Sequence, residues 1–379
     1  MSTIQTNAIV DASGGNTTTV NGISPLANTA RFARNIVING DMKVAQRATT
    51  ATVGPNGTGE GYTVVDRFLN SLNGTVVSTF TQSTDAPSGF AKSAKIEITT
   101  ADNSLASTDF WHFRTSLEGQ DLQHIGKGTS GAKSLTVSFW VKSNKTGVYT
   151  TEFEDTNNSR ISSMSYTINS SNVWEYKSLT FNPDTTGAFT DNPNLSLRIN
   201  FWLVSGSQYQ GGTFYNGTWG ADVDGNRVHN SQVNLGDTVG NSWQITGLQL
   251  ETGSVATDFE HKTYASELTA CQRYYQQLVG GSDQFTFPGK GQGSTTIDGT
   301  FPLAVPLRAS PTMNAISSRF FSDDGFTSSS AAPTANQFIA GNCHLGLQIG
   351  SYSGGVAFAN NHAGVWCPLN STLKIDAEL

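Results

Sequence analysis

Residues 205–220 form a segment whose side chains suit sugar binding. The sequence SGSQYQGGTFYNGTWG carries Tyr209, Phe214, Tyr215 and Trp219 among glycine, serine, glutamine and asparagine residues, without clean alternation. Flat aromatic rings can stack on the apolar side of a pyranose, while amides and hydroxyls bond to its hydroxyl groups. Recognition often resides in loops on a rigid scaffold. These four residues are therefore glycan-binding candidates; the alternative is that they pack inward or against a neighbouring subunit.

A second glycan-binding candidate is Trp111 in the segment TDFWHFRT, which has His112 and Arg114 as polar neighbours. The alternative for this segment is an ordinary strand that places Phe110 and His112 on one face. Three further tryptophans lie in strongly alternating segments, where core packing is expected: Trp140, Trp202 and Trp243.

The segment ADVDGNRVHN is the one suggestive metal-binding pattern. Its Asp222, Asp224 and Asn226 alternate as oxygen ligands do at the start of a calcium loop. Gly225 occupies a spacer position, however, the EF-hand glycine is missing at the sixth position, and no glutamate follows at the twelfth. A solvent-exposed turn is the better interpretation, so the segment predicts neither a metal site nor another cofactor.

Catalytic patterns find little support. The chain has no G-x-S-x-G nucleophile elbow, and its six histidines lack the spacing of a zinc site. Folding could bring Glu118, Glu152 or Asp155 together as a glycosidase pair, but nothing in the sequence singles out two of them. The sequence therefore predicts a protein that is not an enzyme.

Apolar and polar residues alternate with a period of two along the chain, which predicts β-strands. In residues 134–141, SLTVSFWV, one face carries Leu135, Val137, Phe139 and Val141. The same pattern recurs at 95–99, 161–168, 178–181, 195–204 and 243–250, with turn-forming clusters between these segments. No crossover helices separate them, which excludes a parallel α/β fold. We therefore expect an all-β protein built on a jelly-roll β-sandwich.

One short helix is expected at about residues 264–278. In YASELTACQRYYQQL the apolar positions recur every three or four residues, at Leu268, Cys271, Tyr274 or Tyr275, and Leu278. This helix would connect the sandwich to a smaller C-terminal β region at about 279–379. There the segment 301–311, FPLAVPLRASP, resembles a strand whose prolines remove ladder donors, so it should lie at a sheet edge or a bend.

Composition excludes several classes of protein. Charged residues make up 13% of the chain, about half the usual share, whereas 21 Phe, 10 Tyr and 7 Trp supply enough large apolar side chains for folding. No stretch approaches the ~18 apolar residues of a membrane span. A net charge of −7 with scattered Lys and Arg argues against nucleic-acid binding. Cys271, Cys343 and Cys367 are too few and too far apart for a disulfide framework, and free thiols are expected, with a Cys343–Cys367 bridge as the alternative.

Residues 1–34 differ from the rest of the chain. They contain one short alternating piece with Ile4, Ile9 and Val10, followed by ASGGNTTTVNG, and too little apolar surface to fold alone. We expect a sister subunit or a larger assembly to hold this arm. The first residues lack the basic and apolar regions of a secretory signal, so synthesis and assembly in the cytoplasm are expected.

Two segments resemble jelly-roll carbohydrate-binding modules. NIVINGDM, at 35–42, is similar to the opening strand of these modules, and WQITGLQLETG, at 243–253, is similar to their closing strand. Such modules often carry a structural calcium near the opening strand, so the resemblance implies Asp41 as a possible ligand.

A longer series of motifs resembles tail fibre and related virion proteins of bacterial viruses. It comprises NIVINGDMKVAQR (35–47), YTVVDRF (62–68), LTVSFWVKS (135–143), WQITGLQLETGSVATDFEHKTYASEL (243–268) and CQRYYQ (271–276). The N-terminal STIQTNAIVDASGG resembles the virion-attachment arm on fibre proteins of aquatic phages, cyanophages included. The resemblance is clear for 35–276 and weak beyond, and it implies homotrimers that display sugar-binding domains towards the host.

These features lead to the expectation of a phage tail fibre adhesin in the virion, assembled in the host cytoplasm. Its parts would be an attachment arm (1–34), a jelly-roll sandwich (35–262), a helical connector (263–278) and a distal, receptor-facing β domain (279–379). The expected partners are two sister subunits, other tail proteins and host surface polysaccharide, without nucleic-acid binding or membrane insertion. Two alternatives stay open: a capsid decoration or tail adaptor protein with structural contacts only, and a polysaccharide-degrading tailspike.

Overall fold

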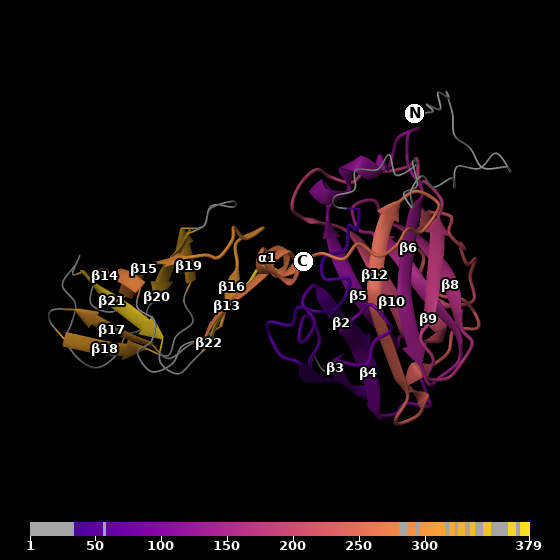
Figure 1. Cartoon of the computed structure of the whole chain (residues 1–379), viewed down its shortest axis with the longest axis horizontal. Coiled ribbons are helices and arrows are strands. Elements are labelled where there is room, and N and C mark those ends of the chain that lie inside the picture. The colour runs from indigo at the N-terminus through magenta and orange to yellow at the C-terminus, as the bar shows by residue number, and fades with distance from the viewer. Residues whose placement is uncertain are drawn as a thin grey trace, which may run out of the picture.

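The architecture comes from a computed structural model of the chain (Figure 1). The structure describes residues 34–55, 58–279, 287–292, 296–314, 318–322, 325–329, 334–337, 344–349, 363–368 and 372–379. Three arm residues of the sequence analysis, Ile4, Ile9 and Val10, lie outside this part, as do Cys343 and the side chain of Cys367. No helix in the described ranges is long and apolar enough to cross a membrane.

Two antiparallel six-stranded sheets pack face to face as a β-sandwich. The first sheet has the order β1 (Thr50–Val53), β3 (Val77–Ser83), β4 (Ser93–Thr100), β12 (Ser242–Thr252), β6 (Leu135–Ser143) and β9 (Glu175–Phe181). The second sheet has the order β11 (Gly220–Ala221), β8 (Arg160–Ile168), β7 (Gly147–Asp155), β10 (Leu195–Ser205), β5 (Phe110–Glu118) and β2 (Phe68–Asn73). All six alternating segments of the sequence analysis lie in these strands, so the expectation of an all-β sandwich is confirmed.

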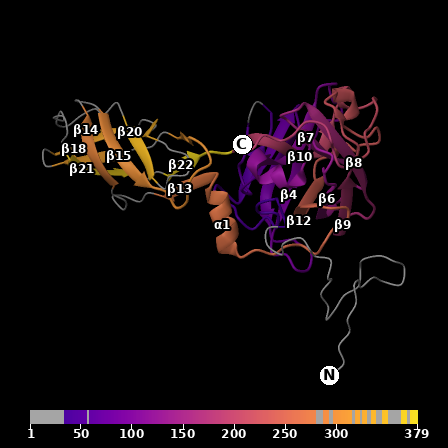
Figure 2. The same ribbon diagram turned by 90° about the horizontal axis from the view of Figure 1, so that it is seen from above.

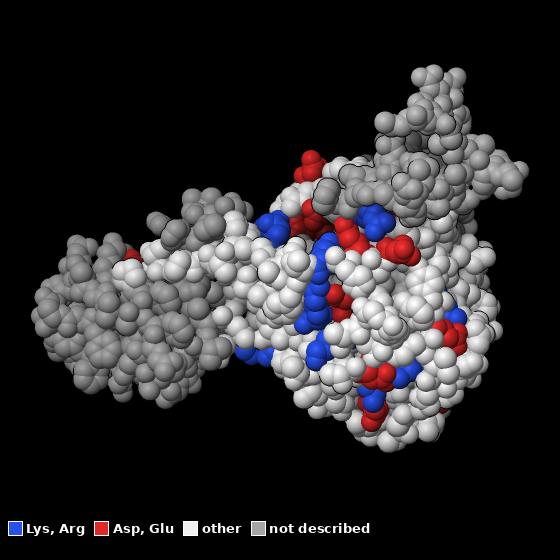
Figure 3. All heavy atoms as spheres, in the orientation of Figure 1, with Lys and Arg blue, Asp and Glu red and all other residues white. Residues whose placement is uncertain are grey.

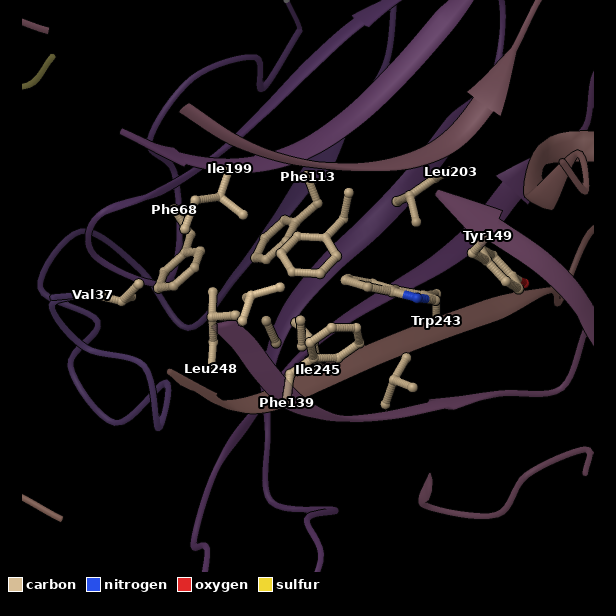
Figure 4. Packing of buried hydrophobic residues seen from close by; sticks show 14 of the residues in the cluster. Val37, Phe68, Phe113, Phe139, Tyr149, Ile199, Leu203, Trp243, Ile245 and Leu248 are labelled. Carbon is tan, nitrogen blue, oxygen red and sulfur yellow. The ribbon is translucent and has the colours of Figure 1, made fainter. Parts of the chain in front are cut away.

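Aromatic and branched side chains from both sheets interdigitate between them (Figure 4). Phe139 of β6 contacts Phe201 of β10 with ring centroids 5.1 Å apart, and Trp243 of β12 contacts Phe113 of β5 at 5.6 Å. All four side chains are fully buried. The alternation in residues 134–141 has its cause here, because every second residue of β6 enters this core.

Short 3-10 turns lie in the loops between strands, at Gly119–Ile125, Ser207–Tyr209, Asp224–Asn226 and Leu235–Asp237. After β12 comes the helix α1 (Tyr264–Gln272), whose N-terminal cap is Thr263; the Thr263 Oγ1 accepts a hydrogen bond from the Ser266 N–H.

Two smaller sheets follow the sandwich (Figures 1 and 2). One has three strands in the order β13 (Tyr275–Val279), β22 (Thr372–Asp376) and β16 (Thr312–Met313). The other has seven strands in the order β18 (Gly325–Ser329), β17 (Ser318–Ser322), β21 (Ala363–Pro368), β14 (Phe287–Gln292), β15 (Thr296–Pro302), β20 (His344–Ile349) and β19 (Thr334–Gln337). The smaller C-terminal β region expected from the sequence is present.

The expected helix at 264–278 is too long by about two turns. It ends at Gln272, and Tyr275–Val279 instead form β13, which pairs with β22 almost a hundred residues later in the chain. Tyr274 and Tyr275 are both 1% exposed, and Tyr275 is the register partner of Asp376 in β22. The distant partner β22 decides the conformation, and local periodicity could not reveal it.

The strand expected at 301–311 is also wrong for most of its length. Only its first two residues belong to β15, which lies inside the seven-stranded sheet rather than at its edge. The rest is irregular chain held by side chains: the Gln276 Nε2 donates to the Val305 carbonyl at 2.8 Å, and Leu307 is fully buried. The strand ends at Pro302 and bends follow it, so the bend alternative is confirmed and the edge alternative is wrong.

A buried network joins the last described residues to the sandwich. Arg67 is 1% exposed; its guanidinium pairs with Glu378, donates to the Ser116 carbonyl at 2.7 Å and lies 3.4 Å from the ring centre of Tyr274. Arg47 pairs with Asp376 at 3.0 Å. The C-terminal residues therefore return to the sandwich, as Figure 2 shows, rather than ending in the seven-stranded sheet.

The network gathers residues from three separate motifs of the sequence. The Gln46 Nε2 donates to the carboxylate of Asp66 and to the Tyr275 carbonyl, and Arg47 lies over the Tyr275 ring at 3.6 Å. NIVINGDMKVAQR, YTVVDRF and CQRYYQ are thus spatially one unit, although they span 35–276. Their shared role is to form the joint between the sandwich and the three-stranded sheet.

Replacing Glu378 with glutamine should destabilise the sandwich strongly. Removing one partner of a buried ion pair leaves an uncompensated charge, here on Arg67, which costs about 3 kcal/mol or more. Glu97→Gln is the matched control, because Glu97 pairs with Lys95 at the surface and its loss should cost under about 1 kcal/mol. Urea unfolding followed by tryptophan fluorescence measures both changes, and equal effects would contradict the structural role of Glu378.

Candidate functional site

An open cleft of about 620 Å³ lies on the outer face of the first sheet. Its floor comes from Ser138 and Trp140 of β6, Tyr176 of β9 and Gly247 of β12. One wall is the 88–90 segment between β3 and β4, and the other is the 256–261 segment that follows β12. The cleft therefore sits where two loops rise beside the centre of the sheet.

Trp140 and Tyr176 form an aromatic pair on this floor. They are register partners on neighbouring strands, and their ring centroids lie 5.5 Å apart. Tyr176 is 46% exposed and Trp140 is partly exposed. The expectation that Trp140 packs in the core is wrong, because the core takes Val137, Phe139 and Val141, and residue 140 points the other way. Trp202 and Trp243 are fully buried, as expected.

A second aromatic group lines the walls. Phe90 contacts Phe259 and His261 from the opposite wall, with centroid distances of 5.1 and 5.2 Å. Gly247 makes this contact possible, because it has a φ of +63° and a Cβ there would lie 2.7 Å from the Phe90 ring. Gly247 of the closing strand β12 therefore leaves the space that the Phe90 ring occupies.

Polar side chains of the closing strand hold the 256–261 wall. Glu251 accepts hydrogen bonds from the Thr257 N–H and hydroxyl, both at 2.8 Å, and the Gln249 Oε1 accepts from the Glu260 N–H at 2.8 Å. Glu260 in turn accepts from the Asn35 N–H at 2.8 Å. Because Gln249 and Glu251 are buried, these bonds are shielded from water and fix the wall.

Residues 35–42, which the sequence predicts as an opening strand, form a turn segment and no strand; this segment is locked to the closing strand β12 beside the wall. The Asn35 Nδ2 donates to the Leu248 carbonyl at 3.0 Å, and its Oδ1 accepts from the Leu250 N–H at 3.1 Å. Gly40 approaches so closely that a Cβ would lie 2.1 Å from the Leu248 oxygen. Asn35 and Gly40 of NIVINGDM are therefore required by the backbone contacts that support the cleft.

An open aromatic floor flanked by hydroxyl and carboxylate groups can bind a flat amphipathic ligand. Clefts of roughly 300–1,000 Å³ with apolar walls and a few polar groups are typical ligand sites. Sequence reasoning missed this site, although the alternation of β6 already placed Trp140 opposite the core residues. The loop aromatics Phe90 and Phe259 gave no such signal.

The structure excludes Trp111 as a glycan-binding surface. Trp111 is 1% exposed and faces the core from β5, where its Nε1 donates to the Asn70 Oδ1 at 3.1 Å. The alternative interpretation is confirmed, since Phe110 and His112 stack on the other face with centroids 4.8 Å apart. Hydrophobic burial therefore outweighs the polar neighbours that suggested a site.

The four aromatic residues of 205–220 do not form a common site. Tyr209 packs on Trp202 at 5.2 Å, and Phe214 meets the ring of His229 edge-on at 5.2 Å. The Tyr215 hydroxyl donates to the Ala221 carbonyl at 2.9 Å, and the Trp219 Nε1 donates to the Asn182 carbonyl at 3.0 Å. These partly buried rings pack against different parts of the protein, which is the inward-packing alternative; sugar binding by their exposed edges stays a prediction.

The three aspartates among the calcium candidates pair with cations of the protein. Asp41 pairs with Lys43 at 2.8 Å, and Asp222 and Asp224 both pair with Arg227. The Asn226 Oδ1 accepts from the Thr213 N–H at 2.7 Å. The described residues contain no group of three or more His, Cys, Asp or Glu side chains that could hold a metal ion. Calcium binding by Asp41 stays a prediction, because Lys43 contacts its Oδ2 while its Oδ1 is buried without a hydrogen-bond partner among the described residues.

The three carboxylates considered for catalysis are fully buried, and each has its own cation. Glu118 binds Arg273 at 2.9 Å, Glu152 binds Arg227 at 2.8 Å, and Asp155 binds Lys127 at 2.5 Å. The free thiol of Cys271 is 1% exposed, and burial raises its pKa well above the ordinary value. These groups stabilise the fold and offer no open nucleophile.

Glu152 belongs to a charged network on the outer face of the second sheet. The Asn200 Nδ2 donates to Glu152 at 2.9 Å and to Glu154 at 3.1 Å, and Arg198 pairs with Glu154 at 2.8 Å. Both ring nitrogens of neighbouring His112 are buried and have no hydrogen-bond partner in the part of the chain that the structure describes. Burial raises the pKa of Glu152 to about 7, and the Arg227 guanidinium opposes that rise.

Stability should therefore fall with rising pH through Glu152. The folded protein keeps this carboxyl protonated to higher pH than the unfolded chain, so it binds more protons between about pH 4.5 and 7. The free energy of unfolding decreases as pH rises through that window. Urea unfolding across it should show a steeper decrease for the wild type than for Glu152→Gln. Glu97→Gln, at the surface, should follow the wild type, and parallel wild-type and Glu152→Gln curves would refute the prediction.

Comparison with known proteins finds distant structural likeness only. No protein-family model and no curated protein matches the sequence. The enzymatically active domain of bacteriophage CBA120 tailspike protein 4 is 13% identical with a TM-score of 0.30; the match covers 58% of this chain and 21% of that one. The chain thus spans about a fifth of that tailspike structure.

Two carbohydrate-binding modules match over nearly their whole length. The family 11 module of Clostridium thermocellum, in complex with a β-1,3-1,4-mixed-linked tetrasaccharide, is 11% identical with a TM-score of 0.26, covering 56% of this chain and 98% of the module. The family 61 module TmCBM61, in complex with β-1,4-galactotriose, is 8% identical with a TM-score of 0.27, covering 58% and 99%. At such identities the likeness concerns the β-sandwich fold alone.

Proposed function

We propose that the chain is a tail fibre adhesin of a bacterial virus, which attaches the particle to host surface glycans through the cleft of the first sheet. The observation that carries the sugar-binding proposal is the exposed pair of Trp140 and Tyr176 on the floor of an open cleft. Partly exposed aromatic rings lose water favourably when an apolar sugar face covers them. The exposed hydroxyl of Ser88 supplies a partner for sugar hydroxyls.

The cleft supports this proposal better than the charged face of the second sheet does. Glu152, Asn200 and Trp202 on that face are fully buried and bonded to one another, whereas the cleft is open. Charged residues on the face seen in Figure 3 are sparse and of mixed sign, which leaves most contacts to neutral groups. Such a surface suits a hydrated, neutral polymer.

The phage role rests on the motifs of the sequence. They resemble those of fibre proteins, and three of them meet at the Arg67 joint, which gives them a common structural reason. In this proposal, residues 1–34 attach to the particle, the chain forms a homotrimer, and the C-terminal β region points towards the host. Linked copies raise effective concentration, so a weak sugar contact becomes firm attachment.

Two other functions are less well supported. A capsid decoration or tail adaptor protein would have no use for an open aromatic floor, which a purely structural protein would cover. A depolymerase would need two accessible carboxylates about 5–10 Å apart. The carboxylates considered in the sequence, Glu118, Glu152 and Asp155, are all fully buried and ion-paired.

Trp140→Ala should weaken glycan binding about tenfold or more, because it removes the stacking surface from the floor. A glycan array probed with the full chain identifies a ligand, and calorimetry then measures both affinities. Trp140 is partly exposed and outside the core, so the variant should keep the melting temperature of the wild type within a few degrees. No binding to any glycan by the wild type would overturn the proposal.

Tyr209→Ala is the matched control for that experiment. Tyr209 is a partly buried aromatic residue on the second sheet's side of the sandwich, away from the cleft. We expect unchanged affinity. If Tyr209→Ala loses binding and Trp140→Ala keeps it, the glycan site is the 205–220 loop and the cleft assignment is wrong.

Light scattering after size exclusion should give about three times the mass of the chain. This measurement tests the homotrimer, which follows from the fibre-like motifs. A stable monomer at micromolar concentration would contradict the proposed avidity mechanism but would leave the cleft's sugar binding to be judged by Trp140→Ala.

A further inference from the structure

We propose that the cleft selects neutral sugars and rejects uronic acids, through the carboxylate of Asp258. This inference rests on the proposed sugar-binding function of the same cleft. Among the described residues that line the cleft, Asp258 carries the only full charge at neutral pH, and no Lys or Arg lines it. The other titratable group there is the exposed imidazole of His261.

The backbone of Asp258 is fixed, while its carboxylate is unused. The Asp258 carbonyl accepts hydrogen bonds from the Arg34 Nη2 at 3.3 Å and the Gln249 Nε2 at 3.4 Å. Neighbouring Thr257 is held by Glu251 through two bonds. Within the described residues, the carboxylate itself makes no hydrogen bond or ion pair, and the residue is exposed. A fixed loop thus presents a free acceptor at the edge of the aromatic floor.

One lysine beside the cleft is already paired. Lys142, the next outward residue of β6 after Trp140, pairs with Asp85. The Arg34 guanidinium bonds to the Thr257 hydroxyl at 2.9 Å and to the backbone of Asp258 rather than to its carboxylate. The negative charge of Asp258 is therefore without a paired cation at the site where a ligand would lie.

A free carboxylate beside an aromatic floor favours one class of sugar. Its two oxygens can accept hydrogen bonds from adjacent sugar hydroxyls, and bonds to a charged acceptor are stronger than neutral ones. A ligand carboxylate would instead be repelled: two like charges about 6 Å apart, at an effective dielectric constant of about 40, differ from a neutral pair by about tenfold in affinity. Neutral polysaccharides therefore fit, and uronate polymers do not.

The test compares oligosaccharides that differ only at C6. Matched tetrasaccharides of β-1,4-glucose and β-1,4-glucuronate, β-1,4-mannose and β-1,4-mannuronate, and α-1,4-galactose and α-1,4-galacturonate are titrated into the full chain by calorimetry. We expect about tenfold weaker binding of the uronate in each pair that binds. The uronate affinity should rise with salt, because salt screens the repulsion, whereas the neutral affinity should not.

Asp258→Asn keeps the shape of the side chain and removes its charge, so it should bring the neutral and uronate affinities close together. Asp191→Asn, which removes an exposed charge elsewhere on the sandwich, should leave the discrimination intact. Equal wild-type affinities within the pairs, or discrimination that persists in Asp258→Asn, would overturn this inference while leaving the proposed function standing. Failure of every tetrasaccharide and of the glycan array would instead overturn the proposed function, and the inference with it.

Discussion

A buried guanidinium joins the two halves of the structure. Arg67 is taken out of water at the joint, so it needs an anion, a carbonyl and aromatic rings around it, and the chain supplies these from positions more than three hundred residues apart. The last residues return to the sandwich where they meet that demand, while pairing with β22 accounts for β13. The joint thus combines a buried charge next to β2 with a strand pairing between distant parts of the chain.

The cleft depends on a related constraint in the closing strand. Gln249 and Glu251 are buried polar residues on the outer face of β12, and each needs partners. The 256–261 loop provides them, and in doing so it becomes the wall that meets Phe90. The cleft wall therefore forms because the buried side chains of Gln249 and Glu251 need hydrogen-bond partners. The closing-strand motif, which resembles that of carbohydrate-binding modules, thus also shapes the site.

The sandwich was predictable because its signal is local. Alternation along β6 and β12 reports which side of a strand meets the core, and all six predicted segments are strands. The outward position of Trp140 was predictable by the same rule, because Trp140 alternates with the core residue Phe139. The expectation of burial considered only that Trp140 lies in a strand. Trp111 shows the opposite case, in which polar neighbours suggested exposure while its parity placed it inside.

The non-local features could not be predicted. β13 exists because β22 pairs with it, and Asp222 and Asp224 face Arg227 rather than a metal ion because the turn folds back on itself. The contact of Phe90 with the opposite wall depends on two loops about 170 residues apart. Each of these outcomes is decided by a partner that the local sequence does not contain.

The two-point attachment of the C-terminal region has a mechanical consequence. The chain leaves the sandwich at Arg273, which forms a two-bond pair with Glu118, and it comes back at Glu378. A pull on the seven-stranded sheet would load both attachments together, in parallel, so neither the outgoing nor the returning strand could peel away alone. The joint should therefore resist tension and restrict rotation of the seven-stranded sheet, whereas a single linker would permit that rotation.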